Sequence, residues 1–300
     1  MDRIDVQKIY KIYIGGQFPR TESGRFYPLN NKKGELLANI CLSSKKDFRN
    51  AVVAARGAFA GWSSRNAFNR SQILYRIAEM MEGRKEQFIS EIILQGGSRK
   101  DAEKEISLSV DRLVYYSGWC DKYSQIFSSV NPVSSSHFNF SVPEPTGVVS
   151  IIAPEENLPA DRHGSLIGLV SVVAPVIASG NTCVVLASAT KPLCAITFAE
   201  VLNSSDVPAG VVNILSGKSS ELLEHFSNHM DVNAIIYCRK NPDEIKKVQE
   251  NSSMNVKRSF IRKENWLSES SQNPYFILDA TEIKTTWHPI ENIGSAKAGY

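Results

Sequence analysis

Five cysteines are the side chains of this 300-residue chain best suited to nucleophilic or metal-binding chemistry. Their number is odd, they are widely spaced, and no two of them form a Cys-x-x-Cys pair, so we expect neither a zinc cluster nor a disulfide framework. Reduced thiols in a cytoplasmic protein are the simpler interpretation. The five are Cys41, Cys120, Cys183, Cys194 and Cys238.

Cys238 differs from the other cysteines because two cations, Arg239 and Lys240, follow it at the end of an apolar run. Neighbouring cations lower the pKa of a thiol and favour the reactive thiolate. A lone cysteine more often fills a small apolar space in the core. We expect that structural role for Cys238.

Two groups of histidines also suggest chemistry. His225 and His229 have the i, i+4 spacing of metal ligands on a helix. Two ligands make a weak site, and His229 is better interpreted as a cation at a helix C-terminus. His163 follows Asp161 and Arg162, a combination that suits acid–base work, but a solvated polar loop is the commoner setting. No metal site is therefore expected.

Composition restricts the possible partners. Hydrophobic residues make up 42% of the chain and charged residues 22%, as in ordinary soluble proteins, and the net charge is +3. The basic cluster of Arg258, Arg262 and Lys263 predicts a solvated face, not a nucleic-acid arm. The apolar run at 166–178 has about thirteen residues, whereas a membrane span needs about twenty. The first residues lack a signal-peptide core. We expect a cytoplasmic protein with neither nucleic acid nor a membrane as partner.

A functional site in this chain would be positioned by the alternating strands and helices predicted in its second half. Continuous apolar runs of this length are typical of buried parallel strands. Helices between them imply right-handed crossovers and one parallel sheet. The predicted strands are 147–153, 182–187, 210–215 and 234–237, and the predicted helices are 166–179, 193–203 and 219–229.

The first half of the chain has a different sequence pattern. Gly15-Gly16 predicts a hairpin turn, and Ser43 or Ser44 predicts a helix N-cap with Asp47 in the first turn. Two long helices are expected at 69–95 and 100–123 from their apolar periodicity. Residues 137–142 alternate as a half-exposed strand does, and 282–287 predict an edge strand.

Six segments, in chain order, resemble aldehyde dehydrogenases. The most specific are APVIASGNTCVVL at 174–186 and VPAGVVNILSG at 207–217, and the closest resemblance is to the degenerate second unit of family 16 aldehyde dehydrogenases. Any one segment alone is weak, but six in order make a specific match. The other four are 11–16 (KIYIGG), 49–62 (RNAVVAARGAFAGW), 110–122 (VDRLVYYSGWCDK) and 143–153 (PEPTGVVSIIA).

The resemblance implies an α/β fold. It consists of a Rossmann-like parallel sheet with N-terminal helices and a small oligomerisation sheet, without most or all of the catalytic domain. A full subunit needs about 450–500 residues in two or three domains. The expected divisions are an N-terminal strand and helical part at 1–123, an oligomerisation strand segment at 124–145, the Rossmann-like unit at 146–250, and at 251–300 a tail whose strand returns to the oligomerisation sheet. Deleting a domain is also expected to leave an apolar face bare.

The catalytic residues of the family are missing. Its nucleophile lies in a Gly-Gln-x-Cys segment, which is absent here. Its general base lies in Glu-Leu-Gly-Gly-Lys, and the corresponding stretch at 256–264 reads VKRSFIRKE. Glu264 is a carboxylate nearby, but without the glycines its backbone setting differs. We therefore assign no catalytic residue.

The family's NAD-binding positions are altered as well. The resemblance places cofactor contacts at Pro154, Asn157 and Gly217, with Glu156 taking the asparagine position in strict register. The lysine for the adenine ribose is replaced by Ala187, and a Gly-Ser turn is replaced by residues 238–240. Acidic groups beside a pyrophosphate repel it by about 1 kcal/mol or more. The expected cofactor is NAD by resemblance, with weak or absent binding.

Three interpretations of function remain open. The first is an inactive aldehyde dehydrogenase family protein that is a scaffold or oligomerisation partner, pairing through the sheet with a second copy or with a full-length dehydrogenase subunit. The alternative is an NAD(P)-dependent oxidoreductase acting on aldehydes with residual cofactor binding. A third possibility is that the chain is a fragment or splice form of a longer two-unit protein.

Overall fold

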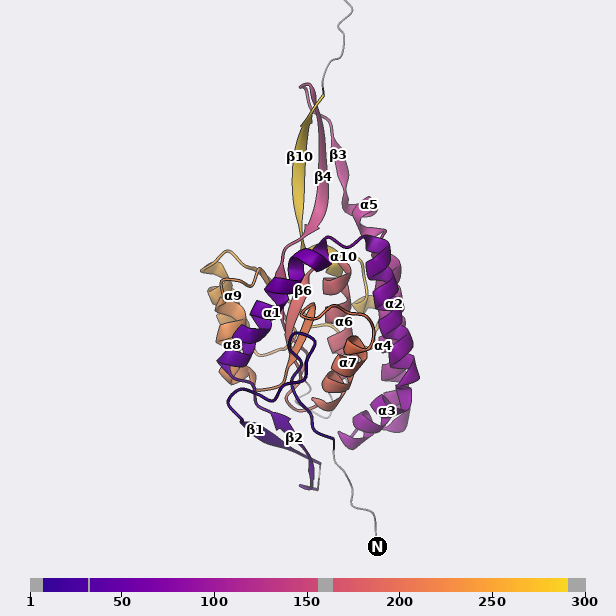
Figure 1. Cartoon of the computed structure of the whole chain (residues 1–300), viewed down its shortest axis with the longest axis vertical. Helices are drawn as coiled ribbons and strands as arrows, with labels where there is room; N and C mark the ends of the chain where they lie inside the picture. The colour runs from indigo at the N-terminus through magenta and orange to yellow at the C-terminus, as the bar shows by residue number, and fades with distance from the viewer. Residues whose placement is uncertain (1–7, 32, 156–163, 291–300) are drawn as a thin grey trace, which may run out of the picture.

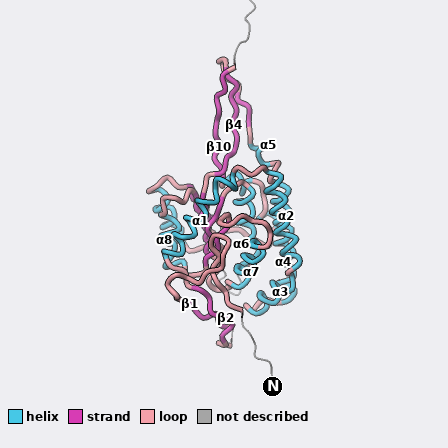
Figure 2. The backbone as a smooth tube through the Cα atoms, viewed as in Figure 1, coloured by secondary structure: helices cyan, strands magenta, loops and turns pink. Residues whose placement is uncertain are grey.

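The computed structural model describes residues 8–31, 33–155 and 164–290. Figure 1 shows a body in which helices cover a central sheet, with a long three-stranded sheet projecting from one end. The tube in Figure 2 separates the helical body from the projecting strands by colour. The two parts are built from quite different sequence patterns.

The central sheet is parallel and has the spatial order β7-β6-β5-β8-β9. Side chains of β5 alternate between its two faces, with Val149 and Ile151 in one apolar cluster and Val148 and Ile152 in the other. Because the chain adds β6 on one side of β5 and β8 on the other, the strand order reverses between β5 and β8. The strands are β5 Val148–Ile152, β6 Thr182–Leu186, β7 Val212–Leu215, β8 Ala234–Tyr237 and β9 Arg258–Ile261.

The fifth strand, β9, was not predicted. Its sequence is Arg-Ser-Phe-Ile and all four residues are half-buried, so it lacks the continuous apolar run of its neighbours. It pairs in parallel with β8 from Ala234↔Arg258 to Tyr237↔Ile261. Pairing with a buried neighbour, more than side-chain hydrophobicity, makes this segment a strand.

Helices cover both faces of the sheet, and each face has its own apolar cluster. α6 is buried along nearly its whole length between the sheet and the layer formed by α2 and α4. α1, α8 and α9 cover the other face. The bounds are α1 Lys45–Ser63, α2 Ala67–Gly83, α3 Lys85–Leu94, α4 Arg99–Trp119, α5 Tyr123–Phe127, α6 Ser165–Ala178, α7 Leu193–Asn203, α8 Ser219–Asn228 and α9 Pro242–Ser253.

Two local predictions are decided by the structure. Ser44, not Ser43, is the N-cap of α1, and it forms a capping box with Asp47. The single helix expected over 69–95 is wrong, because the chain breaks at Arg84 into α2 and α3. Arg84 has φ −108° and ψ 16°, outside helical geometry, and it follows Gly83, a poor helix former.

The remaining strands form two small antiparallel sheets. β1 (Phe26–Asn30) pairs with β2 (Leu36–Cys41). In the projecting sheet, β4 (His137–Pro145) is central, with β3 (Ser129–Asn131) on one edge and β10 (Thr281–Pro289) on the other. β10 and β4 pair along their full lengths, as the resemblance implied.

A buried asparagine fastens the projecting sheet to the body. Only Thr146 and Gly147 separate β4 from β5. The Asn181 Oδ1 atom accepts from the Gly147 N–H at 2.8 Å and from the Thr146 hydroxyl at 3.2 Å, while its Nδ2 donates to the Ala280 carbonyl. Asn181 is fully buried. One side chain therefore holds the end of β4 and the start of β10.

Residues 262–280, here called the bypass segment, lead from β9 to β10 and are folded. They include a 3-10 turn at Glu269–Ser271 and the short helix α10 at Tyr275–Asp279. Trp266 and Ile277 are buried in the main apolar cluster. The buried Arg112 of α4 donates to the carbonyls of Trp266, Ser268 and Ser271. Trp266 and Ile277 thus cover part of the α4–α6 layer, and the expectation of a bare apolar face stays a prediction.

Trp266 tests how much the bypass segment contributes. Trp266→Ala is expected to lower the free energy of unfolding by about 3–5 kcal/mol, because it leaves a large cavity in the core. Phe68→Ala on α2 is the control, since Phe68 is 66% exposed, and is expected to change the free energy of unfolding by about 0.5 kcal/mol or less. Urea denaturation measures both. Equal losses would contradict a structural role for the bypass segment.

Candidate functional site

The candidate site is the carboxyl edge of the parallel sheet at the point where the strand order reverses. In open α/β sheets, ligands bind in the crevice at that point. Glu155 follows β5 closely and Arg239 follows β8 closely, so the two side chains meet across the reversal. Both are buried, with 6% and 8% of their side chains exposed.

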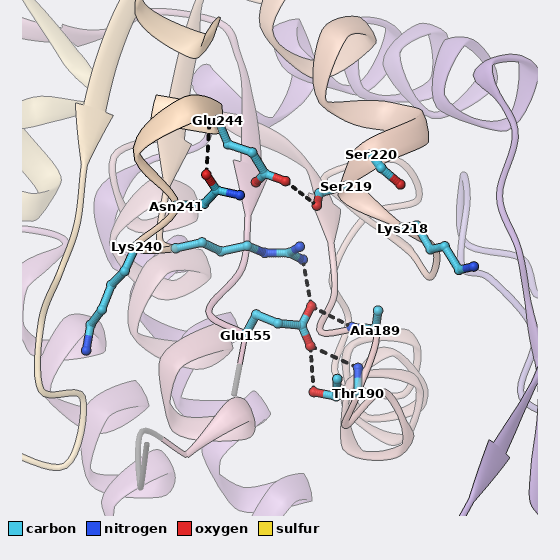
Figure 3. Close-up of a pocket in the computed structure, with 10 residues that line it drawn as sticks. Glu155, Ala189, Thr190, Lys218, Ser219, Ser220, Lys240, Asn241 and Glu244 are labelled. Atoms are coloured by element: carbon cyan, nitrogen blue, oxygen red, sulfur yellow. Dashed lines mark hydrogen bonds and ion pairs between the residues drawn. The ribbon is translucent and has the colours of Figure 1, made fainter. Parts of the chain in front are cut away.

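The Glu155 carboxylate is surrounded by donors. Its Oε1 accepts from the Ser188 hydroxyl at 2.6 Å, the Thr190 N–H at 2.9 Å and the Thr190 hydroxyl at 2.6 Å. Its Oε2 accepts from the Ala189 N–H at 2.9 Å and lies 3.1 Å from a guanidinium nitrogen of Arg239. Figure 3 shows the Glu155 carboxylate beside Ala189 and Thr190, with dashed lines to both. Both oxygens are thus fully used within the chain.

The electrostatics favour an ionised pair. Burial on its own raises the pKa of the Glu155 carboxyl, but the Arg239 charge and the hydrogen bonds from residues 188–190 outweigh burial. Its pKa therefore lies below the ordinary value. Arg239 also donates to the carbonyls of Ala153 at 3.2 Å and Ala187 at 3.5 Å, which lie at the ends of β5 and β6.

The N-terminus of α6 is occupied by a second internal carboxylate. Helix N-termini in such folds hold phosphate through their free N–H groups. Here the Leu166 and Ile167 N–H groups donate to Oε1 of Glu105, at 2.8 and 3.1 Å. Glu105 comes from α4 and is buried. These two amides are therefore already paired within the chain.

The N-terminus of α9 is closed in another way. The Asn241 Oδ1 atom accepts from the Asp243 N–H at 3.0 Å and the Glu244 N–H at 3.4 Å, and Pro242 has no N–H. The Glu244 carboxylate then accepts from the Ser219 hydroxyl and from the Tyr237 hydroxyl, both at 2.7 Å. Asp243 and Glu244 also add negative charge to this helix start, which disfavours a phosphate there.

A cavity of about 660 Å³ opens over this edge. Figure 3 shows the side chains of Lys218 and Lys240 extending away from the Glu155 carboxylate. The polar groups nearest its floor are the paired ones described above. The cavity is lined by Glu155, Ala189, Thr190, Lys218, Ser219, Ser220, Arg239, Lys240, Asn241 and Glu244.

Of the three cofactor positions taken from the resemblance, Pro154 and Gly217 are described by the structure. Pro154 is buried against α6, where a Cβ on Gly168 would lie 2.7 Å from its Cγ. Gly217 lies past β7 beside Ser43, and neither it nor Pro154 lines the cavity. Asn157 and Glu156 lie outside the described residues. All three contacts stay predictions.

Sequence reasoning missed the Glu155–Arg239 pair. It treated the acidic residues after β5 as a source of repulsion and residues 238–240 as a lost turn. The available signal was opposite charge just past two apolar strands that pair in parallel, because such strands end at the same edge of a sheet.

Cys238 and His229 lie in structural surroundings. Cys238 is 6% exposed, and burial raises the pKa of its thiol to about 12, so the structural role is confirmed. Burial lowers the pKa of His229, and its Nδ1 accepts from the Asp231 N–H, which argues against a helix-terminal cation. Within the described ranges, no three His, Cys, Asp or Glu side chains are grouped to hold a metal. His163 and its neighbours lie outside those ranges.

Of the basic cluster, Lys263 is exposed, as a solvated face predicts, whereas Arg258 and Arg262 are partly buried and paired. Arg262 pairs with Asp279, and its guanidinium lies 4.1 Å from the Phe276 ring centroid. Arg258 donates to the Thr281 carbonyl and lies 3.8 Å from Glu282. These cations hold the bypass segment and the start of β10 against β9. Of the stretch where the resemblance puts the general base, 258–261 form β9, and Arg262 follows it directly.

No helix among the described residues is both long and apolar enough to cross a bilayer. The fold and its edge place the chain in the class of doubly wound α/β proteins with a dinucleotide-type crevice. The aldehyde dehydrogenase family model matches residues 18–292. The chain belongs to the aldehyde dehydrogenase family, which confirms the resemblance.

Relatives and solved structures agree on the extent of the match. Cytosolic 10-formyltetrahydrofolate dehydrogenase of Mus musculus is 31% identical over 239 residues, 78% of this chain but 26% of that protein. The NAD+ complex of an aldehyde dehydrogenase from Bacillus cereus superposes with a TM-score of 0.78 at 25% identity, over 85% of this chain and 50% of that one. PnpE from Pseudomonas sp. WBC-3 gives a TM-score of 0.78 at 26% identity, with the same coverage.

The chain thus spans about a quarter of the length of such curated relatives and about half of the solved chains. It carries the aldehyde dehydrogenase fold without most of the catalytic domain, as expected from the sequence. The bypass segment is the connection between β9 and β10.

Glu155→Gln tests the buried pair. The substitution leaves Arg239 buried without a counter-charge, so we expect a loss of about 3 kcal/mol in the free energy of unfolding at pH 7. The matched control is Glu221→Gln, since the Arg25–Glu221 pair is exposed, and it is expected to cost about 1 kcal/mol or less. Urea denaturation monitored by circular dichroism measures both.

The pH dependence of the free energy of unfolding gives the sign of the Glu155 contribution. Because the pKa of Glu155 is lower in the folded state, its stabilising contribution is complete above its unfolded pKa of about 4.3 and disappears as the pH falls through the folded-state value. The difference between wild type and Glu155→Gln should stay constant from pH 7 to pH 5 and shrink below that. A difference that grows on acidification would contradict this assignment.

Proposed function

We propose that this chain is a catalytically inactive member of the aldehyde dehydrogenase family that is a scaffold or oligomerisation partner. The observation that carries the proposal is the Glu155–Arg239 pair across the strand reversal. A family enzyme needs that edge open for its cofactor. Here the chain's own carboxylate uses the donors that an anionic ligand would need.

Absence of NAD binding is part of the proposal. The solved relatives include NAD complexes of the Bacillus cereus enzyme and of PnpE. In this chain, amides of α6 donate to Glu105, amides of α9 donate to Asn241, and the turn at 188–190 donates to Glu155. A pyrophosphate would have to displace these buried partners, and unpaired buried polar groups cost about 1–3 kcal/mol each.

The thiols support inactivity as well. All five cysteines are free and buried. Burial raises the pKa of Cys120 and Cys238 to about 12 and raises those of Cys183 and Cys194 further. A thiol needs its thiolate form to attack an aldehyde. The four cysteines with raised pKa values do not form the thiolate readily, and Cys41 is buried.

The projecting sheet supports a role in assembly. Large apolar side chains are exposed on it, among them Val130 at 67%, Phe138 at 44% and Trp287 at 56%. β10 is an edge strand nine residues long, and exposed edges pair readily with other chains. Exposed apolar groups on such an edge favour a protein partner. We propose a second copy of this chain or a full-length aldehyde dehydrogenase subunit as that partner.

The cytoplasmic location stays a prediction. Among the relatives, one 10-formyltetrahydrofolate dehydrogenase is named cytosolic and another mitochondrial.

The inactivity is tested with the purified full chain. We expect no NADH formation from NAD and a panel of aldehydes above a no-protein blank, because the five cysteines are buried and the donors described at the cofactor edge are already paired within the chain. We also expect no rise in melting temperature at millimolar NAD, whereas binding at a hundred times the dissociation constant would add about 2.7 kcal/mol. Oxidation that disappears on replacing one of the five cysteines would refute the proposal.

Assembly is tested on β10. Trp287→Glu places a charge on the projecting sheet and is expected to weaken association at least about tenfold, because buried aromatic anchors contribute most to such interfaces. The control Phe68→Glu alters an aromatic residue of α2 that is 66% exposed and should leave association unchanged. Light scattering after size exclusion, alone and with a full-length dehydrogenase subunit, measures the effect. A strict monomer with no complex would contradict this role.

A further inference from the structure

We propose that the carboxyl edge of the parallel sheet is an anion receptor whose resident ligand is the chain's own Glu155 carboxylate, and that a free carboxylate or inorganic phosphate takes its place once that carboxylate is removed. The inference concerns the chemistry of this edge and holds whether or not the protein forms assemblies. It identifies a binding site and its ligand class: small oxyanions.

The receptor is held in place by contacts that do not involve Glu155. The Arg239 guanidinium is oriented by the carbonyls of Ala153 and Ala187. The Ser188 hydroxyl oxygen accepts from the Lys191 N–H at 3.0 Å, which shapes the turn. The Tyr27 hydroxyl donates to the Ala189 carbonyl at 3.1 Å. Loss of the Glu155 side chain therefore leaves the donors in position.

The donors are arranged for an oxyanion. Two backbone N–H groups and two hydroxyls of residues 188–190 converge on the carboxylate at 2.6–2.9 Å, and a buried guanidinium completes the shell at 3.1 Å. Successive N–H groups in a turn form anion-binding concavities, and guanidinium matches carboxylate and phosphate geometry. The hydroxyl and amide contacts lie in the range of strong charge-assisted hydrogen bonds, and the guanidinium contact is longer, at 3.1 Å.

A receptor without a bound anion would be unfavourable in free energy. Arg239 is 8% exposed and cannot lose its charge, so without Glu155 it is a buried cation without a counter-charge. That cost drives uptake of an anion from solution. The cavity over the edge gives access, because Glu155 itself lines it. In the wild-type chain, a free anion must compete with a tethered carboxylate whose effective concentration is on the order of millimolar or higher.

The test is chemical rescue of Glu155→Ala. Melting temperatures are measured with sodium formate, acetate or phosphate against sodium chloride at equal ionic strength. We expect a saturable rise of about 3 °C for Glu155→Ala at ten times the dissociation constant of the anion. Wild type and the exposed-pair variant Glu221→Ala should show no saturable rise. A rise with formate and acetate alone identifies a carboxylate receptor, and a rise with phosphate too identifies a general oxyanion receptor.

The double variant Glu155→Ala/Arg239→Ala is the decisive control. Without the guanidinium the rescue should vanish, because the hydroxyls and amides alone do not compensate an anion. Equal rises in the single and double variants, or no rise in the single variant, would overturn the proposal. If Glu155→Ala is recovered only as aggregate, its refolding yield in acetate against chloride is measured instead. A higher yield in acetate supports the receptor and an equal yield refutes it.

Discussion

The organisation of this protein depends on one constraint: a charge buried at the edge of a parallel sheet must be compensated. Arg239 lies past β8, with little access to solvent, and the Glu155 carboxylate from the neighbouring strand end compensates it. Because parallel strands all end at one edge, a side chain just past β5 reaches a side chain just past β8. The strand arrangement that gives this fold a dinucleotide-binding edge also brings Glu155 and Arg239 together, so that their charges neutralise each other.

A second constraint is that a shortened subunit must still cover its core. The chain meets it with the bypass segment, whose Trp266 and Ile277 enter the main apolar cluster. Arg112 donates to carbonyls of that segment, and Arg262 pairs with Asp279 inside it. The shortened subunit therefore packs a short folded stretch against α4 and α6.

Most of the fold can be predicted from the sequence, because apolar runs with helices between them have few arrangements other than a parallel sheet. β5, β6, β7 and β8 have such runs. β9 does not, since its strand character comes from pairing with β8. The site is harder to predict: Glu155 and Arg239 are far apart in the chain, and their contact depends on strand order. Sequence reasoning could establish which cofactor contacts were altered, but not that the new residues bind each other.

The Asn181 junction has a mechanical consequence for the projecting sheet. One buried side chain binds the Gly147 N–H, the Thr146 hydroxyl and the Ala280 carbonyl, at the roots of both long strands. These bonds fix the orientation of the projecting sheet relative to the central sheet. Whatever docks on its tip is held at a set angle to the rest of the molecule, so little orientational freedom is left to lose on docking.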